Sequence, residues 1–348
     1  MLNSIFVIIG TIIGAGFASG KEIFTFFNMH GIYGFIGLIF STSIIGFVIY
    51  KSLSIIIMHN VESYRDFISL TITKSKFMNS IICNIINIFL LVSFIVMVAG
   101  FSAYFTQEFN FPSIFGSLLI SVLCFLTFLN NIDGIVKTNK YFIPFLIFII
   151  LLLGFKNINC LTSFNYHTSS VTHNWIISAV LYASYNLIIV IPILISLKDI
   201  VKKINTAKIV SFFSTFFLLL MAITLFCLLN YYFEDIKNLE LPTIYIASTF
   251  GKSFQFVCGF VILGAIFTTA ISSGYGFLNN LNMANKKLYC IISIIICMVS
   301  IALSNIGFST LLNSLYPILG ILRFCADCFY IIFYQNTLKN LYFIDISM

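Results

Sequence analysis

The chain has 348 residues, of which 60% are hydrophobic and only 8% are charged, and its mean hydropathy is +1.08. This balance excludes a soluble globular domain. The net charge of +7 does not indicate a nucleic-acid partner, because the basic residues lie in short segments between apolar runs and form no domain of their own.

Apolar segments of about 20 residues, the length that crosses the hydrocarbon core of a membrane, recur to the end of the chain. They predict ten transmembrane helices, over residues 2–28, 33–58, 79–105, 113–130, 141–155, 174–197, 207–231, 254–281, 288–303 and 308–334. The predicted fold is an all-α polytopic membrane protein, with one domain over residues 1–348 and the lipid bilayer as its surroundings.

The basic residues predict how these helices are oriented. If the N-terminus lies in the cytoplasm, most of the 18 Lys and Arg residues fall in inner segments, and the outer segments hold only Lys156, Lys237 and Lys252. Positive charge collects on the cytoplasmic side of membrane proteins. We therefore expect a plasma-membrane protein with both termini in the cytoplasm.

The first span contains Gly10, Gly14, Gly16 and Gly20, where a membrane helix is expected to be regular. Glycine destabilises a helix interior, and backbone groups freed at membrane depth must be satisfied by protein or by a water-filled cavity. The pattern predicts a broken helix, whose exposed carbonyl groups suit a cation and whose amide groups suit a carboxylate. Close packing of small residues against a neighbouring helix explains the same glycines.

A charged pair, Lys21 and Glu22, follows these glycines within the same span. Charges inside a membrane are costly and commonly functional. We expect this pair toward the outer mouth, as a gate rather than as a ligand. Glu22 and Asp327 are also candidate proton carriers.

The eighth span carries two adjacent hydroxyl pairs, Thr268-Thr269 and Ser272-Ser273, spaced four residues apart so that each pair repeats on one helix face. Hydroxyl oxygens are hard, neutral groups that suit Na⁺. The alternative is that these hydroxyls bond to carbonyl groups of their own helix or across a helix interface.

The sixth span contains Tyr182, Tyr185, Asn186 and Pro192. If the chain consists of two five-helix halves, this span is the counterpart of the first, and its polar residues and proline predict a second break. A proline kink with tyrosines at a helix interface is the competing interpretation.

Three further features have two interpretations each. Arg323 and Asp327 are four residues apart in the tenth span and form either a gate or a neutralised pair. The outer segment 232–253 is either a lid or a connecting loop. Cys325 and Cys328 form the one C-x-x-C pattern, which in a span indicates small residues on a helix more often than a redox pair.

Two motifs resemble those of a known group. Residues 14–22, Gly-Ala-Gly-Phe-Ala-Ser-Gly-Lys-Glu, resemble the first-span signature of the YkvI-like bacterial membrane proteins, and residues 182–187 resemble their sixth-span pattern. The resemblance covers all ten predicted spans. It implies a relationship to the amino acid–polyamine–organocation transporters and a LeuT-type fold, with two inverted five-helix repeats, about residues 1–156 and 173–335, and discontinuous helices one and six.

The resemblance also implies two sites. One is a solute site between spans one and six, for which the expected residues are Ala15, Gly16, Phe17, Ala18, Ser19, Tyr182, Tyr185 and Asn186. The other is a Na⁺ site between spans one and eight, formed by the carbonyl groups of Gly10, Ile13 and Ala265 and the hydroxyls of Thr268 and Thr269. Na⁺ would act as a coupling ion, and we expect no other cofactor.

These features predict a secondary active transporter of a small amino-acid-like or organic solute, coupled to Na⁺ and working by alternating access. The alternatives are a solute sensor or scaffold that keeps a transporter fold, and a thiol oxidoreductase that uses Cys325 and Cys328. Catalytic Ser/His/Asp and nucleotide-binding patterns are absent from the sequence, so we expect neither an enzyme nor an ATP-driven pump.

Overall fold

The computed structural model describes residues 1–73, 75–129, 131–157, 174–281, 283 and 285–311, with only the backbone described for residues 131–138. Within these ranges every regular element is a helix. In chain order the helices are α1 (Leu2–Ile12), α2 (Ala15–Ala18), α3 (Lys21–Phe26), the 3-10 helix η1 (Asn28–His30), α4 (Gly31–Met58), α5 (Tyr64–Thr71), α6 (Lys76–Phe109), α7 (Ser113–Phe128), α8 (Asn131–Lys156), α10 (Trp175–Ser196), α11 (Ile204–Tyr231), α12 (Phe233–Ile236), α13 (Pro242–Ser248), α14 (Lys252–Asn280) and α15 (Lys286–Ser304).

Seven helical stretches of the described chain are long and apolar enough to cross a membrane, and α1 and α7 are shorter apolar helices. The predicted spans from residue 79 to residue 303 agree with the observed helices to within a few residues, except that α8 begins at Asn131, well before the predicted start. Most of the tenth predicted span lies outside the described residues, so the count of ten stays a prediction.

The sixth span differs from its prediction. Residues Trp175–Ser196 form one continuous helix, α10, with Pro192 inside it. A proline removes one backbone hydrogen bond but keeps a helical φ, and neighbouring helices in a membrane tolerate that loss. Because α10 contains no glycine, Pro192 is the one strong helix-breaking residue in it. The predicted discontinuity of helix six is therefore wrong, and the competing interpretation, a proline within a continuous helix, agrees with the structure as far as the continuity of the helix is concerned.

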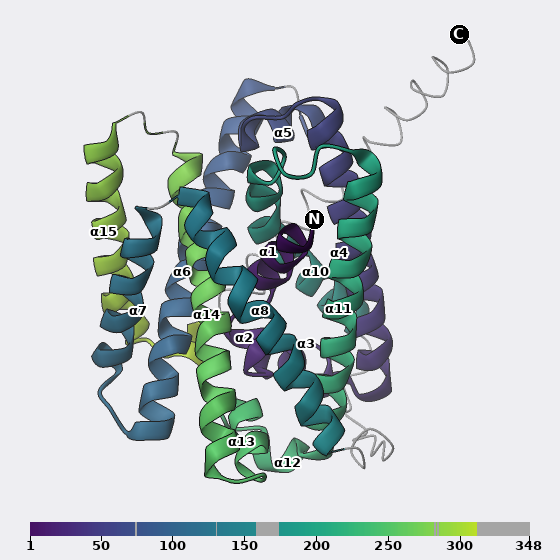
Figure 1. The fold of residues 1–348 in the computed structure, drawn as a ribbon, viewed down its shortest axis with the longest axis vertical. Coiled ribbons are helices and arrows are strands. Elements are labelled where there is room, and N and C mark those ends of the chain that lie inside the picture. The colour runs from purple at the N-terminus through teal and green to yellow at the C-terminus, as the bar shows by residue number, and fades with distance from the viewer. Residues whose placement is uncertain (74, 130, 158–173, 282, 284, 312–348) are drawn as a thin grey trace.

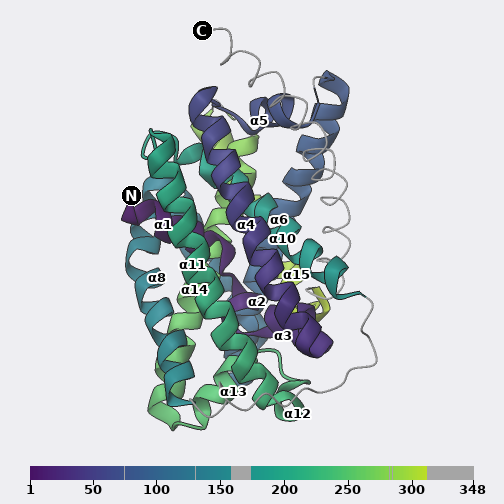
Figure 2. The same cartoon turned by 90° about the vertical axis from the view of Figure 1, so that its right-hand side faces the viewer.

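The long helices form two groups that meet at α1 (Figures 1 and 2). In one group, α6 packs against α7, α14 and α15; in the other, α4 packs against α10 and α11. Helix α1 contacts α10 and α11 of the second group, α14 of the first, and α8. A change in the conformation of α1 would therefore alter its contacts with both groups.

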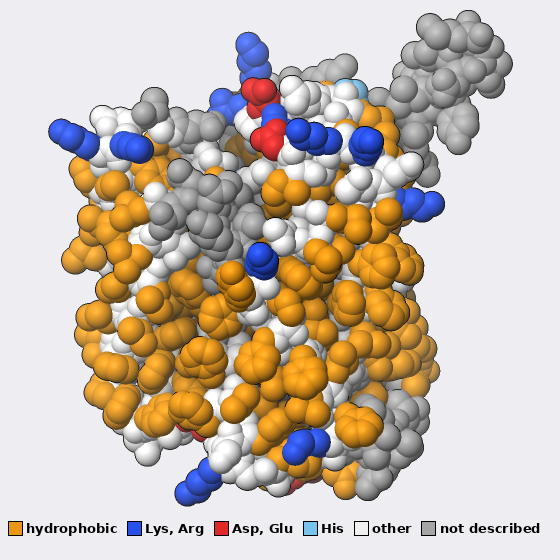
Figure 3. Space-filling model, in the orientation of Figure 1, with side chains coloured by type: hydrophobic (Ala, Val, Ile, Leu, Met, Phe, Trp, Pro, Cys, Tyr) orange, Lys and Arg blue, Asp and Glu red, His pale blue; other side chains and the backbone are white. Residues whose placement is uncertain are grey.

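The surface has the pattern of a membrane protein. Figure 3 shows a broad hydrophobic belt around the middle, with charged side chains gathered at the two ends and most of the Lys and Arg at the end that carries α5. Large apolar side chains such as Phe47, Phe148 and Phe212 are more than half exposed. Apolar surface of this extent is buried in lipid rather than in water.

A tight turn returns the chain from α3 to α4. Gly31 has a φ of 56°, in the left-handed region that favours glycine. One turn later, Gly34 packs so closely on the backbone of Phe27 that a Cβ atom at position 34 would overlap the Phe27 carbonyl oxygen. The hairpin formed by α3 and α4 thus depends on a close backbone approach as well as on the turn.

Replacing Gly34 by alanine should destabilise the hairpin, because the added methyl group meets backbone that cannot rotate away. We expect a loss of about 1–3 kcal/mol, the usual cost of overpacking, measured as a lower Tm of the purified chain. The matched control is Gly37→Ala in the same helix, where the nearest atom, Trp175 Cε3, lies 3.4 Å from the new Cβ. Equal Tm values for the two variants would contradict the close approach.

Candidate functional site

The first span is broken where its glycines predict. Helix α1 ends at Ile12, and Ile13 (φ −81°, ψ 86°) and Gly14 (φ −92°, ψ −164°) are non-helical before α2 begins. The Gly14 amide, which in a continuous helix would bond to the Gly10 carbonyl, donates to Ile12 O at 3.0 Å instead. The Ala15 amide, which would bond to the Thr11 carbonyl, points at Met97 Sδ at 3.2 Å. The break therefore frees carbonyl groups of α1 from helical bonding.

The glycines also allow close packing. A Cβ atom at Gly14 would lie 2.8 Å from Met97 Sδ on α6 and 3.2 Å from Thr269 Cγ2 on α14. Gly20, between α2 and α3, has a φ of 80°, which most other residues adopt only with strain. Gly14 thus provides space, and Gly20 provides the turn that starts α3. Both interpretations of the glycine pattern, a broken helix and close packing against neighbouring helices, therefore apply.

An oxygen cluster joins the break to α14. Thr269 Oγ1 lies 2.7 Å from the Gly10 carbonyl oxygen, 2.9 Å from that of Ile13 and 3.4 Å from that of Thr11. Thr268 Oγ1 lies 2.9 Å from the Ala265 carbonyl oxygen and 3.3 Å from that of Gly10. The five groups predicted to bind Na⁺ are therefore brought together by two helices whose sequences are more than 250 residues apart.

This cluster contains more acceptors than donors. Each threonine hydroxyl carries one hydrogen, whereas the two hydroxyls contact the carbonyl oxygens of Gly10, Thr11 and Ile13 at the break. The Ala265 carbonyl, which Thr268 also contacts, lies inside α14 and takes part in its helical bonding. The side chains are buried, with Thr268 fully covered and Thr269 1% exposed. Buried carbonyl oxygens that share too few hydrogens favour a positive charge among them.

The serine pair of α14 follows the alternative interpretation. Ser272 Oγ donates to Thr268 O and Ser273 Oγ donates to Thr269 O, each at 2.9 Å and within the same helix. Ser272 is also contacted by the Thr11 hydroxyl at 3.2 Å. Of the two hydroxyl pairs on α14, the threonine pair therefore reaches the α1 break most directly.

A second cluster connects α2, α3 and α10. The Tyr185 hydroxyl donates a hydrogen bond to Glu22 Oε2. Glu22 is 2% exposed, and its carboxyl group lies directly against the Cα of Gly16, where any Cβ atom would overlap it. The predicted solute residues Gly16 and Tyr185 thus meet at the carboxyl group of Glu22.

Aromatic rings surround this contact. The Tyr182 and Tyr185 rings are 5.4 Å apart, and Phe26 packs against both at 5.6 and 5.8 Å. Phe27 adds an edge-on contact with Tyr182 at 4.9 Å. All four rings are buried. The Glu22 carboxyl group therefore lies at the edge of a cluster of buried aromatic rings, with which it makes contact through the Tyr185 hydroxyl.

The other expected solute residues have different surroundings. Ser19 Oγ donates to Gly16 O at 3.2 Å and accepts from the Lys21 amide at 3.3 Å, so it stabilises its own turn. Asn186 donates to Tyr182 O at 2.9 Å, and its buried amide oxygen has no partner among the described residues. The remaining three, Ala15, Phe17 and Ala18, are buried apolar residues.

The two charged residues of the first span, Lys21 and Glu22, contact different parts of the structure. Lys21 Nζ donates to Leu239 O at 2.8 Å, in the segment 232–253. Glu22 points inward to Tyr185, which differs from its expected place at the outer mouth. Consecutive helical residues point about 100° apart, so neighbours in sequence face different partners. The other expected gate residues, Arg323 and Asp327, lie outside the described residues, as do Cys325 and Cys328.

The outer segment closes over α2, a contact that sequence reasoning did not assign to a residue. The Thr243 amide donates to Ser19 O and its hydroxyl donates to Ala18 O, both at 2.9 Å. Pro242 precedes it at the first position of α13, a common start signal for a helix and the one hint in the sequence. In this structure α13 therefore packs against the end of α2 and satisfies the Ala18 and Ser19 carbonyl groups, an arrangement that is compatible with both a lid and a connecting loop.

The chain is similar in sequence to two proteins of Bacillus subtilis. No protein-family model matches the chain. The uncharacterized membrane protein YkvI of Bacillus subtilis is 25% identical over 323 residues, covering 90% of each chain. The uncharacterized protein YyaD of the same organism is 27% identical over 324 residues, covering 91% of this chain and 92% of YyaD.

Among solved structures, the substrate-bound outward-open state of a Na⁺-coupled sialic acid symporter has a TM-score of 0.59 at 12% identity. The match covers 91% of this chain and 76% of the symporter chain. At this identity the likeness shows the fold. The chain is thus a multi-pass helical membrane protein that shares the fold of this symporter chain and is similar, over about nine-tenths of its length, to YkvI and YyaD.

Proposed function

We propose that the chain is a secondary active transporter that couples the movement of a small amino-acid-like solute to Na⁺. The observation that carries the proposal is the contact of the Thr269 hydroxyl with the Gly10 and Ile13 carbonyl oxygens across the α1 break. A broken helix that presents carbonyl groups to a hydroxyl-bearing neighbour is the arrangement by which transporters hold a coupling ion. The likeness to a Na⁺-coupled symporter supports the same assignment.

The oxygen cluster fits a monovalent hard cation. Its groups are the neutral carbonyls of Gly10, Ile13 and Ala265 and the hydroxyls of Thr268 and Thr269. Ca²⁺ and Mg²⁺ sites in proteins are commonly completed by carboxylates, and this cluster contains none. Each hydroxyl oxygen keeps lone pairs for a cation when its hydrogen turns away. Na⁺ would then supply the positive charge that the surplus carbonyl groups favour.

The solute would bind beside Glu22, between α2 and α10. A carboxylate that is buried among Tyr182, Tyr185 and Phe26 favours a positively charged group, through both charge pairing and the faces of the rings. The amino group of an amino-acid-like solute has this charge. The amide oxygen of Asn186, on the same helix as the tyrosines, is a further acceptor for such a solute.

Alternating access would follow from relative movement of the two helix groups about α1. In this proposal the segment 232–253 closes the outer side, through the contact of Thr243 with Ala18 and that of Leu239 with Lys21. We assign the α5 end, where most Lys and Arg residues lie, to the cytoplasm together with both termini. We also propose that the chain contains two inverted repeats, at about residues 1–156 and 173–335. Only the first of them begins with a broken helix.

Replacing Thr269 by valine should remove one Na⁺ ligand while keeping the shape of the side chain. In the wild-type chain we expect NaCl to raise Tm relative to choline chloride, because an ion that binds the folded state stabilises it. In the variant, the Na⁺ concentration that gives half of the maximal increase in Tm should be at least about tenfold higher, as expected for the loss of one contact to a charge. The measurement is Tm against Na⁺ concentration at constant ionic strength.

The control for this variant is Ser273→Ala. Its hydroxyl bonds to Thr269 O and Ala270 O of its own helix, so the Na⁺ response of Tm should stay at the wild-type value. A wild-type Tm that is the same in Na⁺ and choline, or an equal loss of response in both variants, would remove the Na⁺ proposal.

Uptake into proteoliposomes tests transport itself. With a panel of amino acids and an inward Na⁺ gradient, we expect accumulation of at least one amine-bearing solute. Glu22→Gln should lower its kcat/KM at least about 100-fold, because breaking a buried ion pair costs about 3–5 kcal/mol. The control is Glu234→Gln, since Glu234 is exposed and pairs with Lys237 at 2.7 Å on the surface.

The same experiment separates the alternatives. Accumulation driven by a pH gradient without Na⁺, and abolished in Glu22→Gln, would replace Na⁺ coupling by proton coupling through Glu22. A solute that raises Tm but is not accumulated under either gradient would show a sensor or scaffold. Unchanged uptake in Glu22→Gln would place the solute away from α2 and α10.

A further inference from the structure

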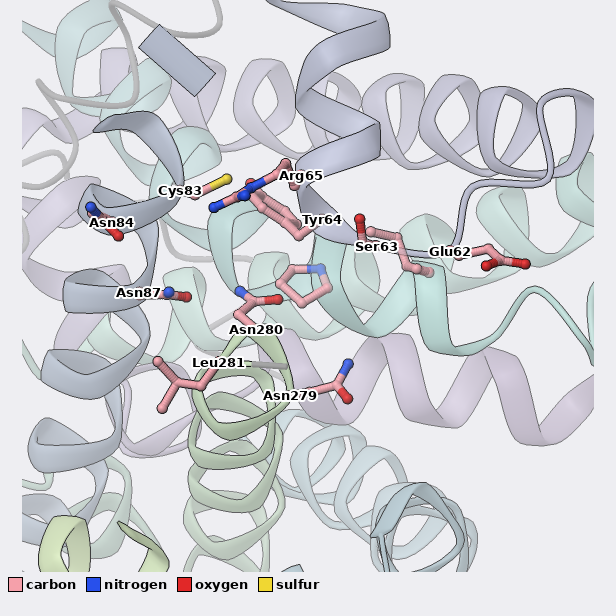
Figure 4. A pocket seen from close by; sticks show the side chains of 12 residues that line it. Glu62, Ser63, Tyr64, Arg65, Cys83, Asn84, Asn87, Asn279, Asn280 and Leu281 are labelled. Carbon is pink, nitrogen blue, oxygen red and sulfur yellow. The ribbon is translucent and has the colours of Figure 1, made fainter. Parts of the chain in front are cut away.

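A polar pocket lies at the end of the bundle opposite α13. It has a volume of about 230 Å³ and is enclosed by α5, the first turns of α6 and the last turns of α10 and α14 (Figure 4). None of its lining residues belongs to the α1 break or to the Glu22 cluster. The chemistry of this pocket is therefore separate from the site proposed for transport.

The pocket presents hydrogen-bonding groups that are not satisfied by the protein. Asn87 Oδ1 on α6 and Asn280 Nδ2 on α14 are both buried and have no partner among the described residues. In Figure 4 these two amides extend from opposite sides toward the space between them. A buried polar atom without a partner is costly. One acceptor and one donor that face the same cavity call for a ligand that carries both.

The charge in the wall is positive. Arg65 reaches the pocket from α5, beside Cys83 (Figure 4). The acidic lining residue, Glu62, has a side chain that is 74% exposed and lies 3.7 Å from Lys198. Figure 4 shows Glu62 turned away from Arg65. Arg65 is exposed as well, but it lies beside Cys83 in the pocket, so the wall offers an accessible guanidinium group, which suits a carboxylate.

Local bonds hold this wall in place. The Asn79 side chain donates to Arg65 O at 3.0 Å and ties α5 to α6. Ser63 accepts from the Asp66 amide at 3.2 Å and so caps the start of α5. Because these hydrogen bonds fix the position of α5 relative to α6, the pocket is preformed in the absence of a ligand.

We propose that this pocket is a second binding site, for a small amino-acid-like compound whose carboxylate pairs with Arg65. Its amino or amide N–H donates to Asn87 Oδ1, and an acceptor oxygen receives a hydrogen from Asn280 Nδ2. The site does not depend on the Na⁺ cluster or on transport. It gives the chain a place to bind solute at the α5 end independently of the central site.

Alkylation of Cys83 measures occupancy, since this half-exposed thiol lines the pocket. The full-length protein in choline chloride is treated with N-ethylmaleimide, with L-glutamine as the probe, and each cysteine is read by peptide mass spectrometry. At ten times its Kd, glutamine should slow Cys83 alkylation about tenfold, because only the free fraction reacts. Cys290, half-exposed on α15 and outside the pocket, is the internal control and should react at an unchanged rate.

Variants assign the contacts. Asn87→Ala and Arg65→Gln should each raise the glutamine concentration for half-protection at least about fivefold, the effect of one lost hydrogen bond. Asn60→Ala, an exposed residue outside the pocket, should not change it. Succinate and acetamide, which each carry only part of glutamine's groups, should protect more weakly.

Three results would overturn the proposal. The first is the absence of Cys83 protection by glutamine up to its solubility limit. The second is acetamide protecting as well as glutamine does, which would remove the role of Arg65. The third is protection that appears only in Na⁺, which would make Cys83 a reporter of the central site. Failure of the Na⁺ proposal would leave the expected protection in choline unchanged.

Discussion

The structure depends on how the carbonyl groups of a broken helix are satisfied inside a membrane-spanning bundle. Lipid offers no hydrogen bonds, so every freed backbone group must find a protein partner, water or an ion. Here the last turn of α1 places the Gly10 and Ile13 carbonyls around Thr269 of α14. Because α14 also packs against α6, and α1 against α10 and α11, this contact links the two groups of helices.

The same break decides where the charges go. After α2, the left-handed backbone of Gly20 starts α3 in a new direction. Lys21 is then directed to the outer segment and Glu22 to Tyr185, although they are adjacent in sequence. A helix that continued unbroken through residues 13–20 would not place the Glu22 carboxyl group against Gly16. Two local departures from helical geometry, at residues 13–14 and at Gly20, therefore build the oxygen cluster on one side and the Glu22 cluster on the other.

Much of this architecture follows from the sequence, because both helix length and helix breaking are local properties. Apolar runs predict the spans, and the glycines predict the break in the first span. The prediction failed at α10, where Asn186 and Pro192 were interpreted as a break. Asn186 instead bonds to the Tyr182 carbonyl of its own helix, which satisfies its donor without any change in the backbone. Polar residues alone therefore did not indicate a break, whereas glycines did.

Contacts between distant segments could not be predicted from one sequence. Nothing in the sequence near Thr243 indicates that it bonds to Ala18, and nothing near Asn87 indicates that it faces Asn280. These pairs are set by how the helices pack, and only a resemblance to a known fold brought spans one and eight together beforehand. For the same reason the polar pocket at the α5 end had no sequence signal.

In the proposed mechanism, the oxygen cluster alone couples Na⁺ binding to the conformational change. An ion shifts an equilibrium between two conformations only by the difference in its affinity for them. The ligands of the cluster are divided between α1 and α14, so any movement that separates these helices removes the Na⁺ site. Na⁺ would therefore favour the conformation in which α1 rests on α14. Because α2 follows directly from the break and lies against Glu22, the same conformation sets the shape of the solute site, and the two binding events become linked through one segment of backbone.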